Sequence, residues 1–308
     1  DDLIEQTGAE AVVICTPHPA HAQDTVAALN RGVHALVEKP LASSLADCDA
    51  MIAAAHASGA KLGVISQRRF YEPVIRAKQA INDGKLGQPI LATAQMYGWR
   101  DQKYYESDPW RGKWDTEGGG VLVNQAPHLL DLFQWYMGPI DELFGYWDNL
   151  NHPYIEVDDT AMAILRFKNG GMGSLVVSNS QKPGIYGKIH VHGSNGSSVG
   201  VQPEGGAMFI AGMTSVQDPP INDLWTIPGE EALLEQWQRE DRARFEQIEP
   251  VGHYLTLQDR DFLQAILEGR EPAVTGAQGR ITVEIFTAIY RSQRDRVPVK
   301  FPVQADVD

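Results

Sequence analysis

Short apolar runs alternate with amphipathic segments over the first seventy residues. Three runs, each ended by turn or polar residues, occupy positions 11–15, 33–37 and 62–65. Continuous apolar runs of this length predict parallel strands that are buried on both faces. The segments between them, 20–31 and 44–58, have the pattern of helices, and each is followed by a glycine. This alternation predicts a parallel sheet with right-handed crossovers, in which ligands bind at the carboxyl ends of the strands.

The pattern changes after residue 70. Residues 73–83 predict an amphipathic helix. Strand-like segments follow at 90–97, 160–167, 173–178 and 188–192. Asn169-Gly170-Gly171 is a hairpin signal, so the second half is predicted to be a mainly antiparallel sheet. Further helices are predicted at 257–268 and 279–292, and the Pro-, Gly- and charge-rich residues 202–250 are predicted to form a long excursion over the surface.

The composition of the chain excludes some classes of binding partner. The chain has 308 residues, enough for about two domains, and 43% of them are hydrophobic, as in an ordinary globular protein. The formal net charge of −14 argues against nucleic acid or an anionic membrane surface as a partner, because both require a basic surface. No apolar run approaches the roughly 18–20 residues of a membrane-spanning helix.

The cysteines and histidines indicate neither a disulfide framework nor a metal site. Cys15 and Cys48 are the only cysteines of the sequence, so a reducing, cytoplasmic location is expected. The histidines at 18, 21, 34 and 56 lack the spacing with carboxylates that metal ligands show, and we predict no metal.

A polar stripe stands out in the second half of the chain. It follows Gly118-Gly119-Gly120 and places Asn124, His128 and Asp131 at i, i+4 and i+7 of a predicted helix, among apolar residues. Holding three polar groups on a buried helix face costs free energy, and function is one reason for a protein to accept that cost.

Four motifs together resemble the family of glucose–fructose oxidoreductase, inositol dehydrogenase and the MocA-type dehydrogenases (Gfo/Idh/MocA). They are Val13-Ile14-Cys15-Thr16-Pro17 with His21, the Glu38-Lys39-Pro40 signature, Arg69-Phe70 before a helix, and Gly118-Gly119-Gly120 with His128 and Asp131. The order and the spacing of the motifs agree with the family over most of the chain.

The resemblance implies a Rossmann-like parallel sheet in residues 1–88, and an α+β domain with a large, mostly antiparallel sheet in residues 89–308. The family's glycine-rich phosphate loop has no counterpart in this sequence. By analogy, about 60 residues are expected to precede Asp1, which makes the Rossmann part N-terminally incomplete. The alternative is a natural half-Rossmann variant.

The resemblance also implies hydride transfer between NAD or NADP and a secondary hydroxyl of a sugar, anhydrosugar or polyol. His128 is then the proton acceptor, because imidazole titrates near neutral pH, and Lys39 matches the family's catalytic lysine, which stabilises the substrate oxygen. Many relatives have Asp where this chain has Asn124, so Asn124 is assigned to positioning the substrate. Asp131 is either a supporting group for His128 or a carboxylate used in helix packing.

Two further groups of side chains are candidates for ligand contacts. The residues expected to bind the cofactor follow the predicted strand ends: Thr16, Pro17, His21, Glu38, Lys39 and Gln67. The residues expected to bind the substrate combine aromatic rings with cations, which suits a sugar ring: Tyr105, Trp110, Arg111 and Lys113. The alternative for the second group is an exposed loop whose aromatic residues serve only packing.

Two other functions on the same fold are left open. One is a sugar- and cofactor-binding sensor without catalysis, which Asn124 would suit, and the other is a glycoside hydrolase that uses bound NAD for a transient oxidation. The resemblance also implies a homodimer or homotetramer that associates through the open face of the large sheet. The sequence does not distinguish NAD from NADP.

Overall fold

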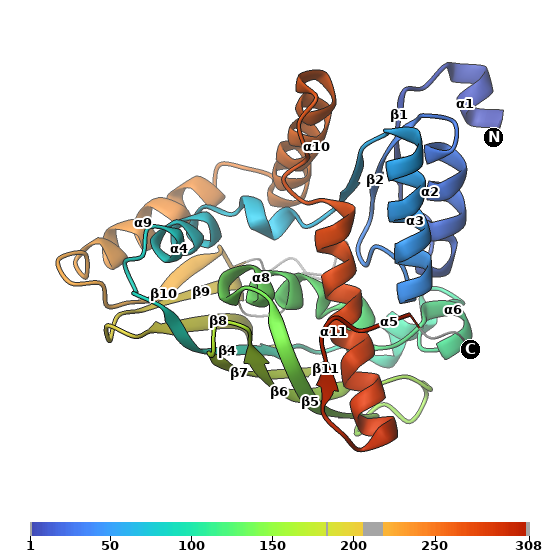
Figure 1. Ribbon diagram of the computed structural model, residues 1–308. Helices are drawn as coiled ribbons and strands as arrows, with labels where there is room; N and C mark the ends of the chain where they lie inside the picture. The colour runs from blue at the N-terminus through green and yellow to red at the C-terminus, as the bar shows by residue number, and fades with distance from the viewer. Residues whose placement is uncertain (1, 183, 206–217, 306–308) are drawn as a thin grey trace.

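The computed structural model describes residues 2–182, 184–205 and 218–305. Two sheets organise the fold (Figure 1). The smaller sheet is parallel and has the strand order β1-β2-β3, with β1 Ala11–Ile14, β2 His34–Val37 and β3 Leu62–Val64. The crossover helices α2 (His21–Leu29) and α3 (Leu45–Ser58) lie side by side on it, and α1 (Asp2–Thr7) precedes β1. The βαβαβ arrangement predicted from the apolar runs is therefore confirmed.

The central strand β2 is apolar from Ala35 to Val37, where both of its faces are covered. Ala35 and Val37 belong to the main core with residues of α2 and α3, whereas Leu36 packs in a second cluster with Ile65 and Phe262. Phe262 lies on α10 (Pro250–Glu268), a helix from the far end of the sequence.

The larger sheet has eight strands in the order β10-β9-β8-β4-β7-β6-β5-β11. Its strands are β4 Pro89–Tyr97, β5 Ile140–Asp148, β6 Thr160–Phe167, β7 Met172–Ser178, β8 Tyr186–Gly193, β9 Ser198–Gly205, β10 Ile221–Trp225 and β11 Val299–Lys300. Neighbouring strands are antiparallel except for the parallel pair β4 and β7. The prediction of a mostly antiparallel sheet is confirmed.

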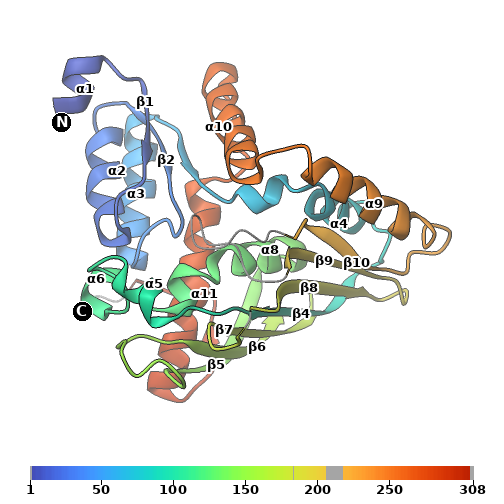
Figure 2. The same ribbon diagram turned by 180° about the vertical axis from the view of Figure 1, so that it is seen from behind.

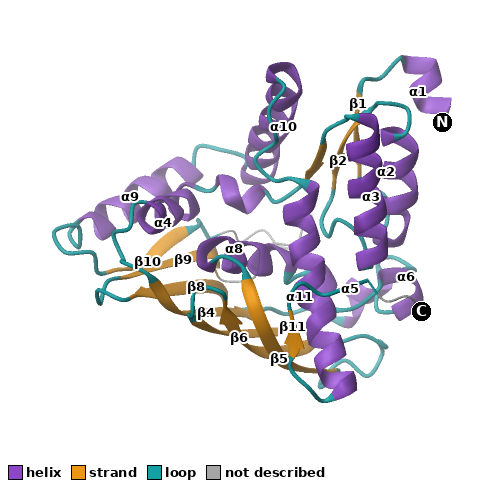
Figure 3. Ribbon diagram, in the orientation of Figure 1, coloured by secondary structure: helices purple, strands orange, loops and turns teal. Residues whose placement is uncertain are grey.

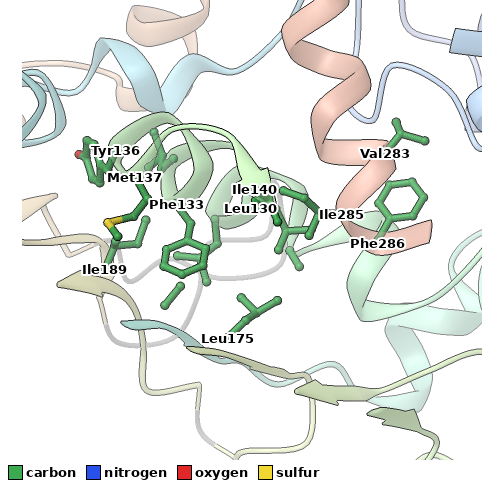
Figure 4. Packing of buried hydrophobic residues seen from close by; sticks show 14 of the residues in the cluster. Leu130, Phe133, Tyr136, Met137, Ile140, Leu175, Ile189, Val283, Ile285 and Phe286 are labelled. Atoms are coloured by element: carbon green, nitrogen blue, oxygen red, sulfur yellow. The ribbon is translucent and has the colours of Figure 1, made fainter. Parts of the chain in front are cut away.

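Helices cover one face of the larger sheet (Figure 3). Phe133 of α8 (Pro127–Met137) is fully buried and packs edge to face on Phe167, and Leu130, Leu175 and Ile189 share its cluster (Figure 4). The strand β6 alternates between buried and exposed residues along its length, as expected for a sheet with a single covered face.

Helix α11 (Gly276–Asp295) contacts both sheets. At its start, Gly279 lies so close to β3 that a Cβ would be 2.6 Å from a methyl group of Val64. Near its end, Ile289 packs against Gly145 of β5. The helix begins in a capping box formed by Thr275 and Gln278, as a Thr-x-x-Gln sequence favours.

The remaining helices are short or lie at the sheet edges. They are η1 His18–Ala20, η2 Gln67–Phe70, α4 Glu72–Asn82, α5 Gln102–Glu106, α6 Trp114–Glu117, α7 Val121–Asn124 and α9 Leu233–Phe245. α5 and α6 lie between the larger sheet and the ends of α2 and α3 (Figure 2). None of the helices in the described part of the chain is long and apolar enough to cross a membrane.

Two predictions from the sequence are wrong. Residues 202–250 are not a surface excursion throughout, because they include the end of β9, β10 and α9; residues 206–217 lie outside the described residues. Helix α9 has few apolar residues, but Leu234 and Trp237 pack on the core, and this sparse pattern concealed the helix.

The polar stripe is also not on one helix. The helix α7 ends at Asn124, and α8 begins at Pro127, which has no backbone N–H to continue the first helix. Asn124 and His128 thus lie on two successive helices, which are joined by Gln125 and Ala126 with backbones in the right-handed helical region.

Candidate active site

A cleft of about 480 Å³ opens at the carboxyl ends of the three parallel strands. Its walls come from the loops after these strands, from the segment 100–111, from α7 and α8, and from α10. The carboxyl edge of a parallel sheet is where ligands bind in open α/β folds, so this cleft is the candidate active site.

Lys39 enters the cleft from the end of β2, and its peptide bond to Pro40 is cis, as the resemblance implied. Its Nζ atom donates to the backbone oxygen of Asn124 at 3.0 Å and approaches the side-chain oxygen of the same residue at 3.4 Å. Burial lowers the pKa of Lys39 from its usual 10.5, and the positive charges of Arg68 and Arg111 lower it further, while Glu38 opposes this change.

His128 lies in the first turn of α8 and lines the same cleft. Burial lowers its pKa well below 6.5, and the charges of Arg68 and Lys39 act in the same direction. The imidazole is therefore neutral at physiological pH, which leaves a ring nitrogen able to accept a proton.

A buried carboxylate stands behind Asn124. The Asn124 amide donates to Glu117 Oε1 at 2.5 Å, and the other oxygen of Glu117 accepts from the Gly112 backbone N–H at 2.5 Å. Burial raises the pKa of Glu117, while its hydrogen bonds to Gly112 and Asn124 lower it. These contacts fix the side chain of Asn124 with its oxygen toward Lys39. No pattern in the sequence selects Glu117, although it directly precedes the three glycines.

Asp131 is turned away from the cleft. Its two oxygens accept from Arg69 at 2.8 and 2.5 Å, and Oδ2 also accepts from the Ser66 hydroxyl at 2.5 Å. The carboxylate thereby ties α8 to the turn after β3. Of the two roles considered for Asp131, these contacts favour packing, and its support for the site is indirect.

Four of the predicted cofactor residues besides Lys39 line the cleft: Thr16, His21, Glu38 and Gln67. The ring of His21 bridges the backbone oxygens of Thr16 and Pro40, at 2.8 and 2.9 Å, and so joins the loops after β1 and β2. Pro17 caps the short helix η1 beside them.

The predicted substrate residues divide into two pairs. Trp110 and Arg111 line the cleft, and the Arg111 guanidinium lies over the rings of Trp110 and Tyr104 at 4.4 Å from each. Tyr105 packs in a small buried cluster with Ile155 and Val157, and Lys113 is exposed at the start of α6. Tyr104, and not its neighbour, faces the cleft.

Two family models match this chain. The model described as "Oxidoreductase family, NAD-binding Rossmann fold" matches residues 1–66, and "GFO/IDH/MocA C-terminal domain" matches residues 74–199. Together they cover more than half of the chain. The chain belongs to the Gfo/Idh/MocA family.

Individual relatives agree with this assignment. Myo-inositol 2-dehydrogenase of Thermotoga maritima is 26% identical over 97% of this chain and 82% of its own length. A 1-carboxy-3-chloro-3,4-dihydroxycyclohexa-1,5-diene dehydrogenase of Comamonas testosteroni is 34% identical, over 58% of this chain but only 44% of the relative. The WlbA dehydrogenase of Bordetella pertussis, solved with NADH and UDP-GlcNAcA, superposes with a TM-score of 0.85 at 29% identity and covers 98% of this chain and 82% of that one.

The cleft of this Gfo/Idh/MocA protein fits a nicotinamide dinucleotide at the strand ends. The Gln67 side-chain oxygen is buried there and has no hydrogen-bond partner among the described residues, so it can accept from a bound ligand. Within the described part of the chain, no group of three or more His, Cys, Asp and Glu side chains is placed to hold a metal ion.

Sequence reasoning missed Arg68, Arg100, Tyr104 and Gln125, all of which line the cleft. Arg68 follows β3 and Arg100 comes shortly after β4, so the strand-end rule that selected Gln67 could have found both arginines. Tyr104 belongs to the same stretch of aromatic and cationic residues as Tyr105, and this signal did not show which of the two neighbours faces the cleft. Gln125 carried no signal, because its position depends on how the chain returns to the cleft.

Proposed function

We propose that this protein transfers a hydride between NAD or NADP and a secondary hydroxyl of a sugar, anhydrosugar or polyol. The observation that supports it best is the placement of Lys39 and His128 in one cleft, at the carboxyl edge of a sheet that matches an NAD-binding fold. The named dehydrogenases among its relatives act on molecules with ring hydroxyls, as myo-inositol 2-dehydrogenase does.

The side chains of the cleft have different roles in the oxidation of an alcohol. His128, kept neutral by burial, takes the proton of the reacting hydroxyl, and the Lys39 ammonium donates a hydrogen bond to the oxygen as negative charge develops on it. Asn124, held by Glu117, orients the substrate without exchanging a proton. The nicotinamide, when bound near Thr16, Glu38 and Gln67, supplies the hydride acceptor.

The test is turnover of a panel of inositols, anhydrosugars and nucleotide sugars by the full-length protein, followed at the absorbance of reduced nicotinamide. Lys39→Ala and His128→Ala are each expected to lower kcat by about 10²–10⁴-fold, as for loss of a general acid or base. Lys300→Ala, which removes a cation exposed on the surface, is the matched control. Unchanged turnover in the two cleft variants would refute the assignment.

Binding without chemistry would point to the sensor alternative. In that case, the protein binds both NADH and a sugar, and no member of the panel changes the absorbance. Release of a glycosyl leaving group without net reduction of the cofactor would instead identify the hydrolase.

We propose that residues 1–88 contact mainly the cofactor, that residues 89–308 hold the substrate, and that the protein works in a reducing, cytoplasmic compartment. Both of its cysteines are free thiols, which supports the last point.

We also propose a homodimer or homotetramer. The uncovered face of the larger sheet exposes Tyr146 on β5, Met162 and Ile164 on β6, and Met172 on β7, and Ile164 is 65% exposed. These strands are neighbours, so the side chains form one apolar patch, which on a soluble protein indicates a contact surface.

A further inference from the structure

One wall of the cleft carries a positive charge that the protein does not neutralise. Arg100 lines the cleft and is only 6% exposed. Its Nη1 atom donates to the Trp99 backbone oxygen at 2.8 Å, but its Nε atom is buried and has no acceptor. Within the described residues no carboxylate forms an ion pair with it. A guanidinium keeps its charge when buried, so such a residue costs free energy unless an anion comes to it.

The surroundings of Arg100 do not supply that anion. Burial lowers its pKa; Tyr104, which hydrogen-bonds to it, and Tyr105 raise the pKa, and the charge of Arg111 lowers it. Its guanidinium also lies over the Tyr104 ring, at 5.3 Å from the centroid, but neither tyrosine is an anion at neutral pH.

Arg111 itself is compensated, since its Nε atom donates to Asp108 at 2.9 Å. Glu117, buried behind Asn124, interacts electrostatically with Arg111 and Lys39 and forms no ion pair with Arg100. Among the described residues, Arg100 is therefore left as a cation of this wall without an ion pair, in a protein whose net charge is −14.

None of the described carboxylates elsewhere in the cleft forms an ion pair with Arg100. Glu204 forms an ion pair with Arg68, and Glu38 accepts from the backbone N–H of Lys39 at 3.0 Å. Asp218 lines the cleft on the segment that leads to β10 and forms no ion pair with Arg100.

Tyr104 makes this wall rich in hydrogen-bond donors. Its hydroxyl oxygen accepts from Arg111 at 2.6 Å, from Gln125 at 3.0 Å and from Asn124 at 3.2 Å. Because three N–H groups already point at this oxygen, its own hydrogen must be directed elsewhere. A ligand at this wall meets N–H and O–H donors, which suit a group that only accepts.

We propose that the substrate carries a carboxylate, as a sugar acid does, and that Arg100 and Arg111 bind it beside Tyr104. This inference rests on the proposed function, because it places the carboxylate on the molecule that Lys39 and His128 oxidise. A carboxylate accepts hydrogen bonds only and carries one charge, which matches the single charge of Arg100; a phosphate ester brings closer to two. A hydroxyl of a neutral sugar can also accept hydrogen bonds from this wall, but it brings no negative charge to offset Arg100.

The test is calorimetric binding to the full-length protein at saturating NADH, with uronic and aldonic acids measured beside their neutral sugars and the sugar phosphates. The acids are expected to bind about 10- to 100-fold more tightly than the neutral sugars, as charged hydrogen bonds provide. Arg100→Gln should abolish that preference, because it should weaken the binding of the acids at least tenfold more than the binding of the neutral sugars, and Arg100→Lys should restore part of it. If Arg100→Gln does not fold, Arg111→Gln replaces it. Arg111→Gln is expected to weaken the binding of the acids in the same way.

Arg166→Gln is the matched control, because Arg166 is an exposed arginine on β6 and should leave the preference intact. Equal affinity for acids and neutral sugars, a preference that survives in Arg100→Gln, or tighter binding of the phosphates would each overturn the proposal. Turnover separates it from the proposed function. Acids that bind through Arg100 and never reduce NAD would refute the dehydrogenase alone, whereas neutral sugars turned over without any preference for acids would refute the carboxylate site alone.

Discussion

The side-chain amide of Asn124 bridges a buried carboxylate and an ammonium: it donates to Glu117 at 2.5 Å and its oxygen lies 3.4 Å from Nζ of Lys39. The negative charge of the site thus lies behind the amide and not on residue 124 itself. Glu38 and, to a smaller extent, Glu117 raise the pKa of Lys39 against the effect of burial.

Asn124→Asp should therefore destabilise this protein in a pH-dependent way. It would place two carboxylates within hydrogen-bond distance, and one of them must stay protonated in the folded state. A carboxyl pKa raised by folding makes the folded protein bind the extra proton, so the free energy of unfolding, relative to wild type, should fall as pH rises from about 5 to 8. Urea unfolding at the two pH values measures this difference. The double variant Glu117→Gln with Asn124→Asp should remove it, and equal stability of Asn124→Asp and wild type at both values would contradict the prediction.

The pH profile of kcat/KM should show a wide plateau. Activity is lost on acidification when His128 becomes protonated, and because its pKa is lowered, the acid limb should lie below pH 6.5. Activity is lost at alkaline pH when Lys39 loses its proton, and this limb should lie below 10.5. Lys39→Arg, if active, should move the alkaline limb upward, since arginine stays protonated. An acid limb above pH 6.5 would exclude the buried His128 as the proton acceptor.

The ion pair of Asp131 and Arg69, which links α8 to the turn after β3, should contribute strongly to the free energy of unfolding. Asp131→Asn breaks a buried, two-pronged ion pair with Arg69 and leaves the guanidinium uncompensated, which costs about 3–5 kcal/mol. Thermal or urea unfolding measures the loss. Asp295→Asn removes an exposed partner of Arg294 and is the control, with an expected effect below about 1 kcal/mol. If the two variants lose equal stability, the buried pair does not have the role assigned to it.

The apolar patch on the larger sheet should control assembly. Ile164→Glu places a charge at its centre and is expected to shift the molar mass measured by light scattering from that of a dimer or tetramer to that of a monomer. Ile75→Glu, on the exposed side of α4, is the control and should not change the mass. A monomeric wild-type protein would refute the proposed assembly.

Local signals predicted most of the fold. The apolar runs at β2 and β3 identified buried strands because both faces of these strands are covered, and the alternation along β6 identified a strand with one covered face. The run at β1 also forms a strand, but the prediction that it is buried on both faces is wrong, because Val13 is 53% exposed. The signals failed where a segment contributes only a few apolar residues, as in α9, or where two helices meet at a proline, as at Asn124 and Pro127. In both places, distant contacts determine the local structure.

For a related reason, only some residues of the candidate site could be predicted from the sequence. Lys39 and His128 lie in motifs with fixed spacing, so the sequence could select them. Glu117 and Tyr104 act through Asn124, which they reach from other segments. A carboxylate before a glycine or a tyrosine in a short helix is ordinary, and only the folded chain shows that both touch the same amide.

The helix α11 sets the separation between the two walls of the cleft, although none of the described cleft-lining residues belongs to it. Its twenty residues make a rod of about 30 Å, pressed against β3 through Gly279 at one end and against β5 at the other. Because the helix is rigid and contacts both sheets, it fixes the distance between them. One inserted residue would rotate the far end of the helix by about 100°. This rotation would change the distance between the two sides of the cleft, although no side chain that lines the cleft would be altered.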